Sequence, residues 1–161
     1  MTRKLLVIVA ALTTLGAACG PEPVSGEKTG TGLDALFDPD KLVIINNNGD
    51  RHEFDVYIAA NYQQQRRGLM FVRDLPETSG MLFVYERAGM HSMWMKNTYI
   101  PLDIIFARAD GTVSSVIHDT EPLSLESLGS IEPVSYVLEL NAGTARRYGI
   151  GRRSRLIWEP D

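Results

Sequence analysis

The sequence predicts a single α+β domain that is predominantly β. We expect a compact barrel-like or sandwich-like arrangement of about seven or eight short strands with two short helices. From Leu42 onward, short apolar runs are separated by turn signals at close intervals, a pattern typical of a β-rich domain. The 161 residues suffice for one ordinary domain, and 44% of them are hydrophobic, as in a globular chain. A single cysteine excludes intrachain disulfides and cysteine-rich metal sites, so the fold must depend on packing.

The amino end has the pattern of a secretory signal. Arg3 and Lys4 precede an uncharged apolar run at 5–18, which is shorter than the roughly 20 apolar residues of a membrane-spanning helix. The run ends in small residues before Cys19 and resembles a bacterial lipoprotein signal, although Gly16 stands where that signal usually has a large aliphatic residue. We therefore expect residues 1–18 to be a cleaved signal peptide and Cys19 to be lipidated. A lipid anchor of this kind would hold the exported domain at the bacterial cell envelope.

The segment after the cysteine predicts a flexible tether. Residues 19–40 are rich in Gly, Pro and small polar residues and lack apolar periodicity, so we expect one globular domain at 41–161. Sixteen basic against twenty acidic residues give 16 − 20 = −4, and loss of the two basic residues in the signal gives 14 − 20 = −6. This charge disfavours nucleic acid as a partner, and an anionic membrane would repel the domain without its lipid. The sequence indicates no oligomeric state.

The elements follow one another with local turn and capping signals. Strands are predicted at 42–46 and 53–59, joined by a hairpin turn that contains the Asn-Gly pair ending at Gly49. Asn61 can cap a short helix that stops at Gly68, and Asn141 is expected to cap a second one through Tyr148. Asp110-Gly111 predicts another hairpin. The remaining strands are predicted at 81–85, 92–97, 103–108, 112–118, 134–140 and 156–158.

Several motifs resemble those of one family of exported domains. They are Arg67-Gly68-Leu69-Met70, Gly80-Met81-Leu82-Phe83, the long segment 94–106, and 137–143. Together they resemble the family called domain of unknown function 192, over about residues 43–158. The resemblance implies a small β-rich domain with minor helices and no established reaction. Met93 stands where the family usually has phenylalanine, which implies the same buried role for an apolar side chain.

A polar cluster is expected where two predicted strands meet. Lys96 ends one strand and Asp103 begins the next, so we expect the two side chains to face each other at a hairpin mouth. The favoured interpretation is structural, an ion pair that ties the connecting loop. The functional interpretation is a cleft for a small polar ligand such as a sugar or a carboxylate. The candidate ligand-binding residues are Arg67, Lys96, Asn97, Thr98, Asp103 and Glu139.

Two further patterns have a plain structural explanation that we favour. His91, Met93 and Met95 alternate along a predicted strand and share a face, and imidazole and thioether groups suit copper(I). Three such positions span about 13 Å in line, and methionines usually fill cores, so we predict neither a metal site nor a cofactor. The basic residues Arg146, Arg147, Arg152, Arg153 and Arg155 are expected to be a solvated helix end and strand edge rather than a surface for lipid or an acidic partner.

These observations favour a membrane-anchored binding or accessory domain for a small polar or carbohydrate-like ligand. The alternative is a hydrolase or transferase that acts on envelope carbohydrate, because Asp103, Glu139 and three histidines could serve acid and base roles. No nucleophile–base spacing or phosphate-binding loop identifies such an enzyme, so no catalytic residue is assigned.

Overall fold

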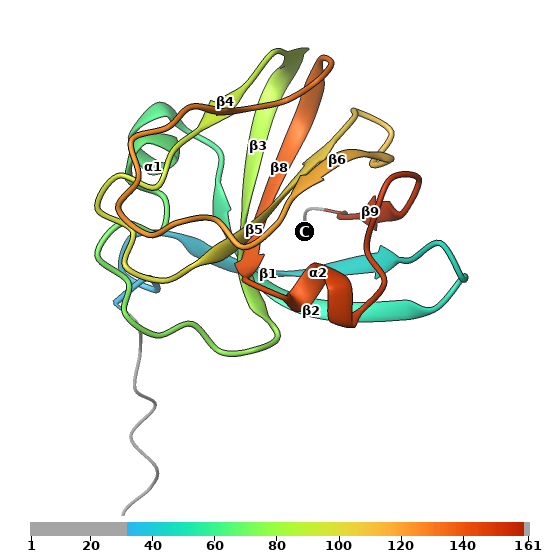
Figure 1. Cartoon of the computed structure of the whole chain (residues 1–161), viewed down its shortest axis with the longest axis horizontal. Helices are drawn as coiled ribbons and strands as arrows, with labels where there is room; N and C mark the ends of the chain where they lie inside the picture. Colours follow the sequence, from blue (N-terminus) through green and yellow to red (C-terminus); the bar gives the residue numbers. More distant parts are fainter. Residues whose placement is uncertain (1–31, 160–161) are drawn as a thin grey trace, which may run out of the picture.

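The structure is a computed structural model that describes residues 32–159. Figure 1 shows a strongly curved sheet with the two short helices beside it. In chain order the elements are β1 (Asp38–Ile45), β2 (Arg51–Ala59), α1 (Tyr62–Arg67), β3 (Ser79–Gly89), β4 (Ser92–Met93), β5 (Leu102–Ala107), β6 (Val113–Ile117), β7 (Leu128–Gly129), β8 (Val134–Asn141), α2 (Thr144–Arg147) and β9 (Arg155–Ile157).

Seven of these strands form one sheet in the order β6-β5-β8-β3-β2-β1-β9, and β4 and β7 form a separate two-stranded sheet. Only β2 and β3 pair in parallel, so the connection between them, which contains α1, must cross over from one end of the sheet to the other. The sheet curls until β9 meets the β5–β6 turn, where Thr112 and Arg155 form a bridge. The predicted β-rich class is confirmed, and of its two forms the sheet takes the nearly closed barrel.

Alternate residues of the strands build a core on each face of the sheet. Leu82, Ile105 and Leu138 belong to a cluster that includes residues of both β1 and β9, so this cluster fills the inside of the barrel. Phe83 and Phe106 belong to a second cluster on the outer face, where the loops around α1 and β4 cover the sheet. Most of the predicted site residues lie in or beneath these covering loops.

Both predicted hairpins are present, because each turn has a residue suited to its backbone. Gly49 has φ 87° in the β1–β2 turn, where its N–H donates to the Asn46 carbonyl. Gly111 has φ 79° in the β5–β6 turn and lies against β9, so that a Cβ atom here would be 2.1 Å from the Leu156 carbonyl oxygen. Glycine at this position therefore permits the contact that closes the barrel.

The first helix agrees with its prediction, whereas the cap of the second was predicted wrongly. Asn61 accepts a hydrogen bond from the Gln64 backbone and completes a capping box at α1. The N-cap of α2 is Gly143, and Asn141 instead donates to the Leu75 carbonyl at 2.8 Å. The Ala145 N–H in the first turn of α2 donates instead to the carboxylate of Asp103 on β5. The side chain that caps this helix therefore comes from a distant strand.

Two boundaries also differ from the prediction. The strand expected at 92–97 is only β4, because the chain then turns: the Met95 N–H donates to Ser124 and the Thr98 N–H donates to the Met95 carbonyl. The fold begins before residue 41, since Leu33 is buried in the outer core and β1 starts at Asp38. The predicted signal peptide and Cys19 lie outside the described residues. No helix within 32–159 is long and apolar enough to span a membrane.

Candidate functional site

Five of the six predicted ligand-binding residues lie around one groove and the small cavity beside it. The groove has a volume of about 410 Å³, and we call it the Tyr62–Trp94 groove after the two aromatic residues that line it. The neighbouring cavity, which we call the Glu139 cavity, has a volume of about 20 Å³. Lys96 and Asn97 line the groove, whereas Arg67, Thr98 and Glu139 line the cavity. The two hollows share four lining residues, Gln65, Arg66, Met70 and Trp94.

Two segments position the groove. Helix α1 supplies Tyr62, Gln65 and Arg66, and its capping box fixes where the helix begins. The turn after β4 supplies Trp94, Lys96 and Asn97. Asn97 has φ 57°, and its carbonyl accepts a hydrogen bond from the Phe71 N–H at 2.8 Å, which ties this turn to the segment that follows α1.

The two aromatic residues of the groove are unusually exposed for their size. Tyr62 is 71% exposed and Trp94 is 48% exposed. The Arg66 guanidinium lies 5.6 Å from the Tyr62 ring centroid, and the Lys96 ammonium lies 5.0 Å from that of Trp94. Each ring therefore carries a cation beside it, an arrangement in which the ring quadrupole attracts the charge.

The polar groups of the groove differ in how fully their hydrogen-bonding capacity is used. The Gln65 amide donates to the Val84 carbonyl at 2.9 Å, which holds it in place. The Ser92 hydroxyl pairs with that of Ser127 at 2.6 Å. Among the described residues, the Asn97 amide has only the Met70 sulfur as its acceptor, at 3.9 Å, and thioethers are weak acceptors. Asn97 is therefore the amide in this groove that is free to bind a better acceptor.

Glu139 is the acid at the base of the adjoining cavity. Glu139 lies on β8 and is 4% exposed, and its side chain forms no hydrogen bond with any residue of 32–159. Burial raises the pKa of its carboxyl group to about 8. At neutral pH the group is thus mostly protonated and can donate a hydrogen bond as an acid. The cavity has room for about one water molecule or one ligand hydroxyl group.

Tyr85 and His91 pack together near this acid. Burial raises the pKa of Tyr85 to about 12, and the charge that Glu139 can carry adds to the effect. The His91 ring stacks on Tyr85 with centroids 3.5 Å apart, and burial lowers the pKa of this histidine. The buried Nε2 atom of His91 has no hydrogen-bond partner within the described residues. The pair forms a neutral wall next to the outer core.

Asp103 corrects one part of the sequence prediction. It is fully buried on the inner face of the sheet, where its two carboxylate oxygens accept hydrogen bonds from the Asp119 N–H at 3.0 Å and the Ala145 N–H at 2.8 Å. His118 lies 3.7 Å away. Lys96 is exposed above Trp94, so the expected pair does not form. Asp103 has a structural role that joins β5 to α2 and to the loop after β6, away from the groove.

The residues considered for copper are mainly core residues. Met93 and Met95 both belong to the outer-face cluster. The Tyr85 hydroxyl lies 4.0 Å from the Met93 sulfur, and the Thr120 hydroxyl donates to the Met95 sulfur at 3.2 Å. Across residues 32–159, no group of three or more His, Cys, Asp or Glu side chains could hold a metal ion. The thioethers thus pack against aromatic and hydroxyl neighbours.

The arginine-rich segment divides into two parts. Arg146 and Arg147 at the end of α2 form ion pairs with Asp119 and Glu77. Arg152 and Arg153 line a broad hollow of about 710 Å³ together with Arg108, Asn46, Asn47, Thr112 and Val113. This arrangement agrees with a solvated edge at the closure of the barrel.

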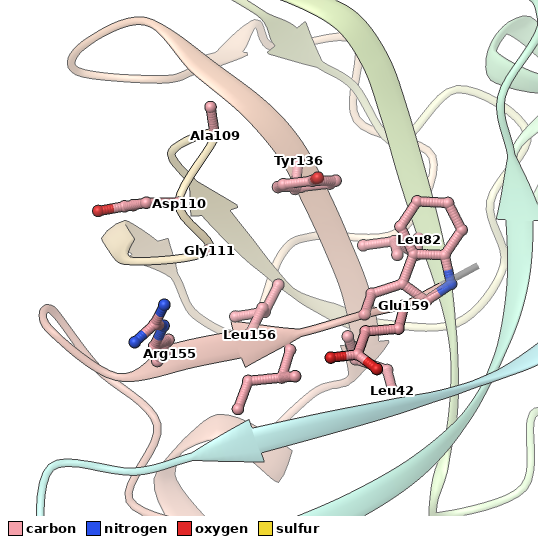
Figure 2. Close-up of a pocket in the computed structure, with 11 residues that line it drawn as sticks. Leu42, Leu82, Ala109, Asp110, Gly111, Tyr136, Arg155, Leu156 and Glu159 are labelled. Atoms are coloured by element: carbon pink, nitrogen blue, oxygen red, sulfur yellow. The ribbon is translucent and has the colours of Figure 1, made fainter.

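A further pocket, of about 290 Å³, opens at the mouth of the barrel and was not predicted from the sequence. Figure 2 shows Leu42, Leu82 and Leu156 of its apolar lining, with Tyr136 across the opening. Trp158 meets Tyr136 edge to face at 6.3 Å between centroids, and its indole N–H donates to Asp40 at 2.7 Å. The sequence analysis did not include the aromatic residues of the groove or of this mouth among the candidate site residues. A signal for Trp94 was available, because in an alternating segment it shares a face with the charged Lys96.

The fold and the groove define a small β-barrel domain with a cationic and aromatic hollow on the outer face of its sheet. The family described as "Uncharacterized ACR, COG1430" (DUF192) matches residues 43–158, and the chain belongs to this family. This confirms the resemblance drawn from the motifs.

Two solved structures are similar to the chain. One is a Sinorhizobium meliloti 1021 protein described as a proposed transcription regulator, with 39% identity and a TM-score of 0.74 over 75% of this chain and 94% of that one. The other is a protein of unknown function from Novosphingobium aromaticivorans DSM 12444, with 32% identity and a TM-score of 0.73 over 92% of this chain and 100% of that one. None of the curated proteins compared with the chain matches it.

Proposed function

We propose that this protein is a lipid-anchored binding domain of the bacterial cell envelope that holds a small, carbohydrate-like ligand in the Tyr62–Trp94 groove. The observation that carries the proposal is the pair of exposed aromatic rings on one hollow whose other side chains are mostly polar. An aromatic ring offers a flat apolar surface to the C–H face of a sugar ring, while amide and charged groups bind its hydroxyls. Such a mixture of apolar walls and a few polar groups is typical of small-molecule sites.

The place at which the described residues begin supports an anchored function. Leu33 packs in the outer core, and the Leu36 carbonyl accepts a hydrogen bond from Gln64 of α1. The described part of the chain thus begins next to the helix that lines the groove. The ligand site would then lie close to the membrane that holds the lipid.

Catalysis on envelope carbohydrate is the second candidate, because Glu139 is a protonated acid at neutral pH next to the groove. Glycoside hydrolases usually need two carboxyl groups within about 10 Å on either side of the scissile bond. No carboxylate in the described part of the chain lines the groove, and Asp103 is on the opposite face of the sheet. Binding without turnover is therefore better supported than hydrolysis.

A screen of the purified protein against envelope glycans tests the proposal. We expect a glycan to bind and to be recovered with unchanged mass, and we expect Tyr62→Ala and Trp94→Ala to abolish the binding. Leu125→Ala is the matched control, because this side chain is 70% exposed but does not line the groove. A changed product mass would favour the enzyme, and binding that survives both aromatic substitutions would contradict the assignment of the groove.

The anchor has a separate test. Cys19→Ala should release the protein from the membrane fraction, since no other lipid attachment is expected. If the leader is removed from this variant and the protein still stays with the membrane after a salt wash, Cys19 is not the anchor.

A further inference from the structure

The Tyr62–Trp94 groove combines positive charge with exposed aromatic rings, a combination that the lining of the hollow at Arg152 and Arg153 does not have. Its charged lining residues are Arg66 and Lys96, and no acidic side chain within residues 32–159 lines it. Neither cation forms an ion pair within the described residues, whereas Arg108, Arg146 and Arg147 each pair with a carboxylate. The whole chain has a net charge of −4. Two uncompensated positive charges in one hollow of an acidic protein will attract an anion.

The surroundings of the groove extend the same pattern. The Arg67 guanidinium lies 4.8 Å from the Phe71 ring centroid, and that of Arg73 lies 4.6 Å from the ring of Tyr99. Phe71 and Tyr99 meet edge to face at 6.2 Å. Four cations on this side of the molecule are therefore held against aromatic rings rather than against acids. Arg66 donates one N–H to the Tyr62 hydroxyl and Arg67 donates one to the Met70 carbonyl, so most of the five N–H donors of each guanidinium remain available to a ligand.

The acid that borders the adjoining cavity, Glu139, does not cancel this charge. Glu139 is buried and without a hydrogen-bond partner within residues 32–159. Its carboxyl group keeps its proton until the pH approaches about 8. In that form it would donate a hydrogen bond to a ligand oxygen and would not repel an anion.

We propose that the groove selects carbohydrates that carry a carboxylate, with Arg66 and Lys96 binding the carboxylate and the rings of Tyr62 and Trp94 packing on the sugar. This inference rests on the proposed function and names its ligand class. An arginine can bind both oxygens of a carboxylate at once, and a lysine adds a point charge. The Asn97 amide, now facing only a thioether sulfur, would exchange that weak acceptor for a sugar hydroxyl.

Matched pairs of sugars with and without a carboxylate test the inference. One pair is N-acetylmuramic acid and N-acetylglucosamine, and another is tetragalacturonate and its methyl ester. Binding is measured by nuclear magnetic resonance titration of the purified protein. We expect each acid to bind about ten-fold or more tightly than its neutral counterpart, and the preference to shrink as salt is added.

Variants assign the preference to particular side chains. Arg66→Gln and Lys96→Gln should each lower the affinity for the acids about ten-fold and leave the neutral sugars unchanged. Arg51→Gln removes an exposed cation from β2, away from the groove, and serves as the matched control. A control that lowers the affinity equally would contradict local recognition.

The outcomes separate this inference from the proposed function. Equal binding of acids and neutral sugars in the groove overturns the inference and keeps the carbohydrate site. No binding of any sugar overturns both. Vesicles with anionic lipids and a single-stranded oligodeoxynucleotide are the competing anions. Binding of either through Trp94, with no response to the sugar acids, would show that the cations serve a lipid surface or a nucleic acid and would overturn the inference.

Discussion

Replacing the buried acid Glu139 by glutamine should remove a specific pH dependence of stability. Glutamine has nearly the same shape but cannot ionise. In the folded protein burial raises the pKa of Glu139 to about 8, compared with 4.5 for an unperturbed glutamate. Between these two values the folded chain keeps the proton that the unfolded chain releases. The contribution of this carboxyl group to the free energy of unfolding is therefore fully present below about pH 4.5, and it is lost as the pH rises through about 8.

The size of the effect follows from the difference between the two pKa values. The difference is 8 − 4.5 = 3.5 units, and each unit corresponds to about 1.4 kcal/mol. The free energy of unfolding should thus fall by about 5 kcal/mol between acidic pH and pH above 8 because of this one group. That loss is comparable to the whole stability of many small domains, about 5–15 kcal/mol.

Urea unfolding at pH 5, 6, 7 and 8 measures this directly, with the wild-type protein and Glu139→Gln compared at each pH. We expect the variant to be similar to or slightly less stable than the wild type at pH 5 and more stable by several kcal/mol at pH 8. Glu126→Gln removes an exposed carboxylate and controls for the substitution itself. A difference between Glu139→Gln and wild type that stays constant from pH 5 to 8 would refute the reasoning.

Three other predictions concern the architecture. Asp103→Ala leaves two backbone N–H groups without their acceptor and should lower the free energy of unfolding in urea by about 2–4 kcal/mol. Lys96→Met on the surface should change the same free energy by less than about 0.5 kcal/mol. Equal effects of the two substitutions would contradict the places assigned to these residues. Gly111→Ala should lower the free energy of unfolding by at least about 2 kcal/mol, because its Cβ would collide with the β9 backbone, and an unchanged midpoint would argue against the barrel closure. Met93→Leu and Met95→Leu should each lower the free energy of unfolding by less than about 1.5 kcal/mol. A titration of the wild-type protein with copper(I) against a competing chelator should find no tight one-to-one site. A tight site that is lost in both variants would overturn the assignment of these methionines to the core.

Features with local causes were predictable from the sequence. The turn at Gly49, the turn at Gly111 and the capped helix after Asn61 each depend on residues within four positions of one another. Turn chemistry and capping act over that range, so the sequence contains the whole signal. The strands on either side followed from their apolar runs.

Features that depend on distant contacts were not predictable in the same way. The segment 102–107 is apolar apart from one acid, so its alternation did not reveal that Asp103 faces the inside of the barrel. Its partner, the Ala145 N–H, is more than forty residues away along the chain, and the Asp103 carboxylate accepts from this N–H of α2 where a cap from Asn141 was expected. The groove is likewise formed by α1 and the turn after β4, which only the folded chain brings together.

The central claim is that the ligand binds between Tyr62 and Trp94. The protein has two tryptophans, and they lie in different hollows: Trp94 lines the groove and Trp158 lines the barrel mouth. The most direct measurement is therefore a titration of the two indole N–H resonances with N-acetylmuramic acid. We predict that the Trp94 signal shifts and saturates while the Trp158 signal stays in place. A saturating shift of the Trp158 signal alone would locate the site in the barrel mouth and would contradict this account.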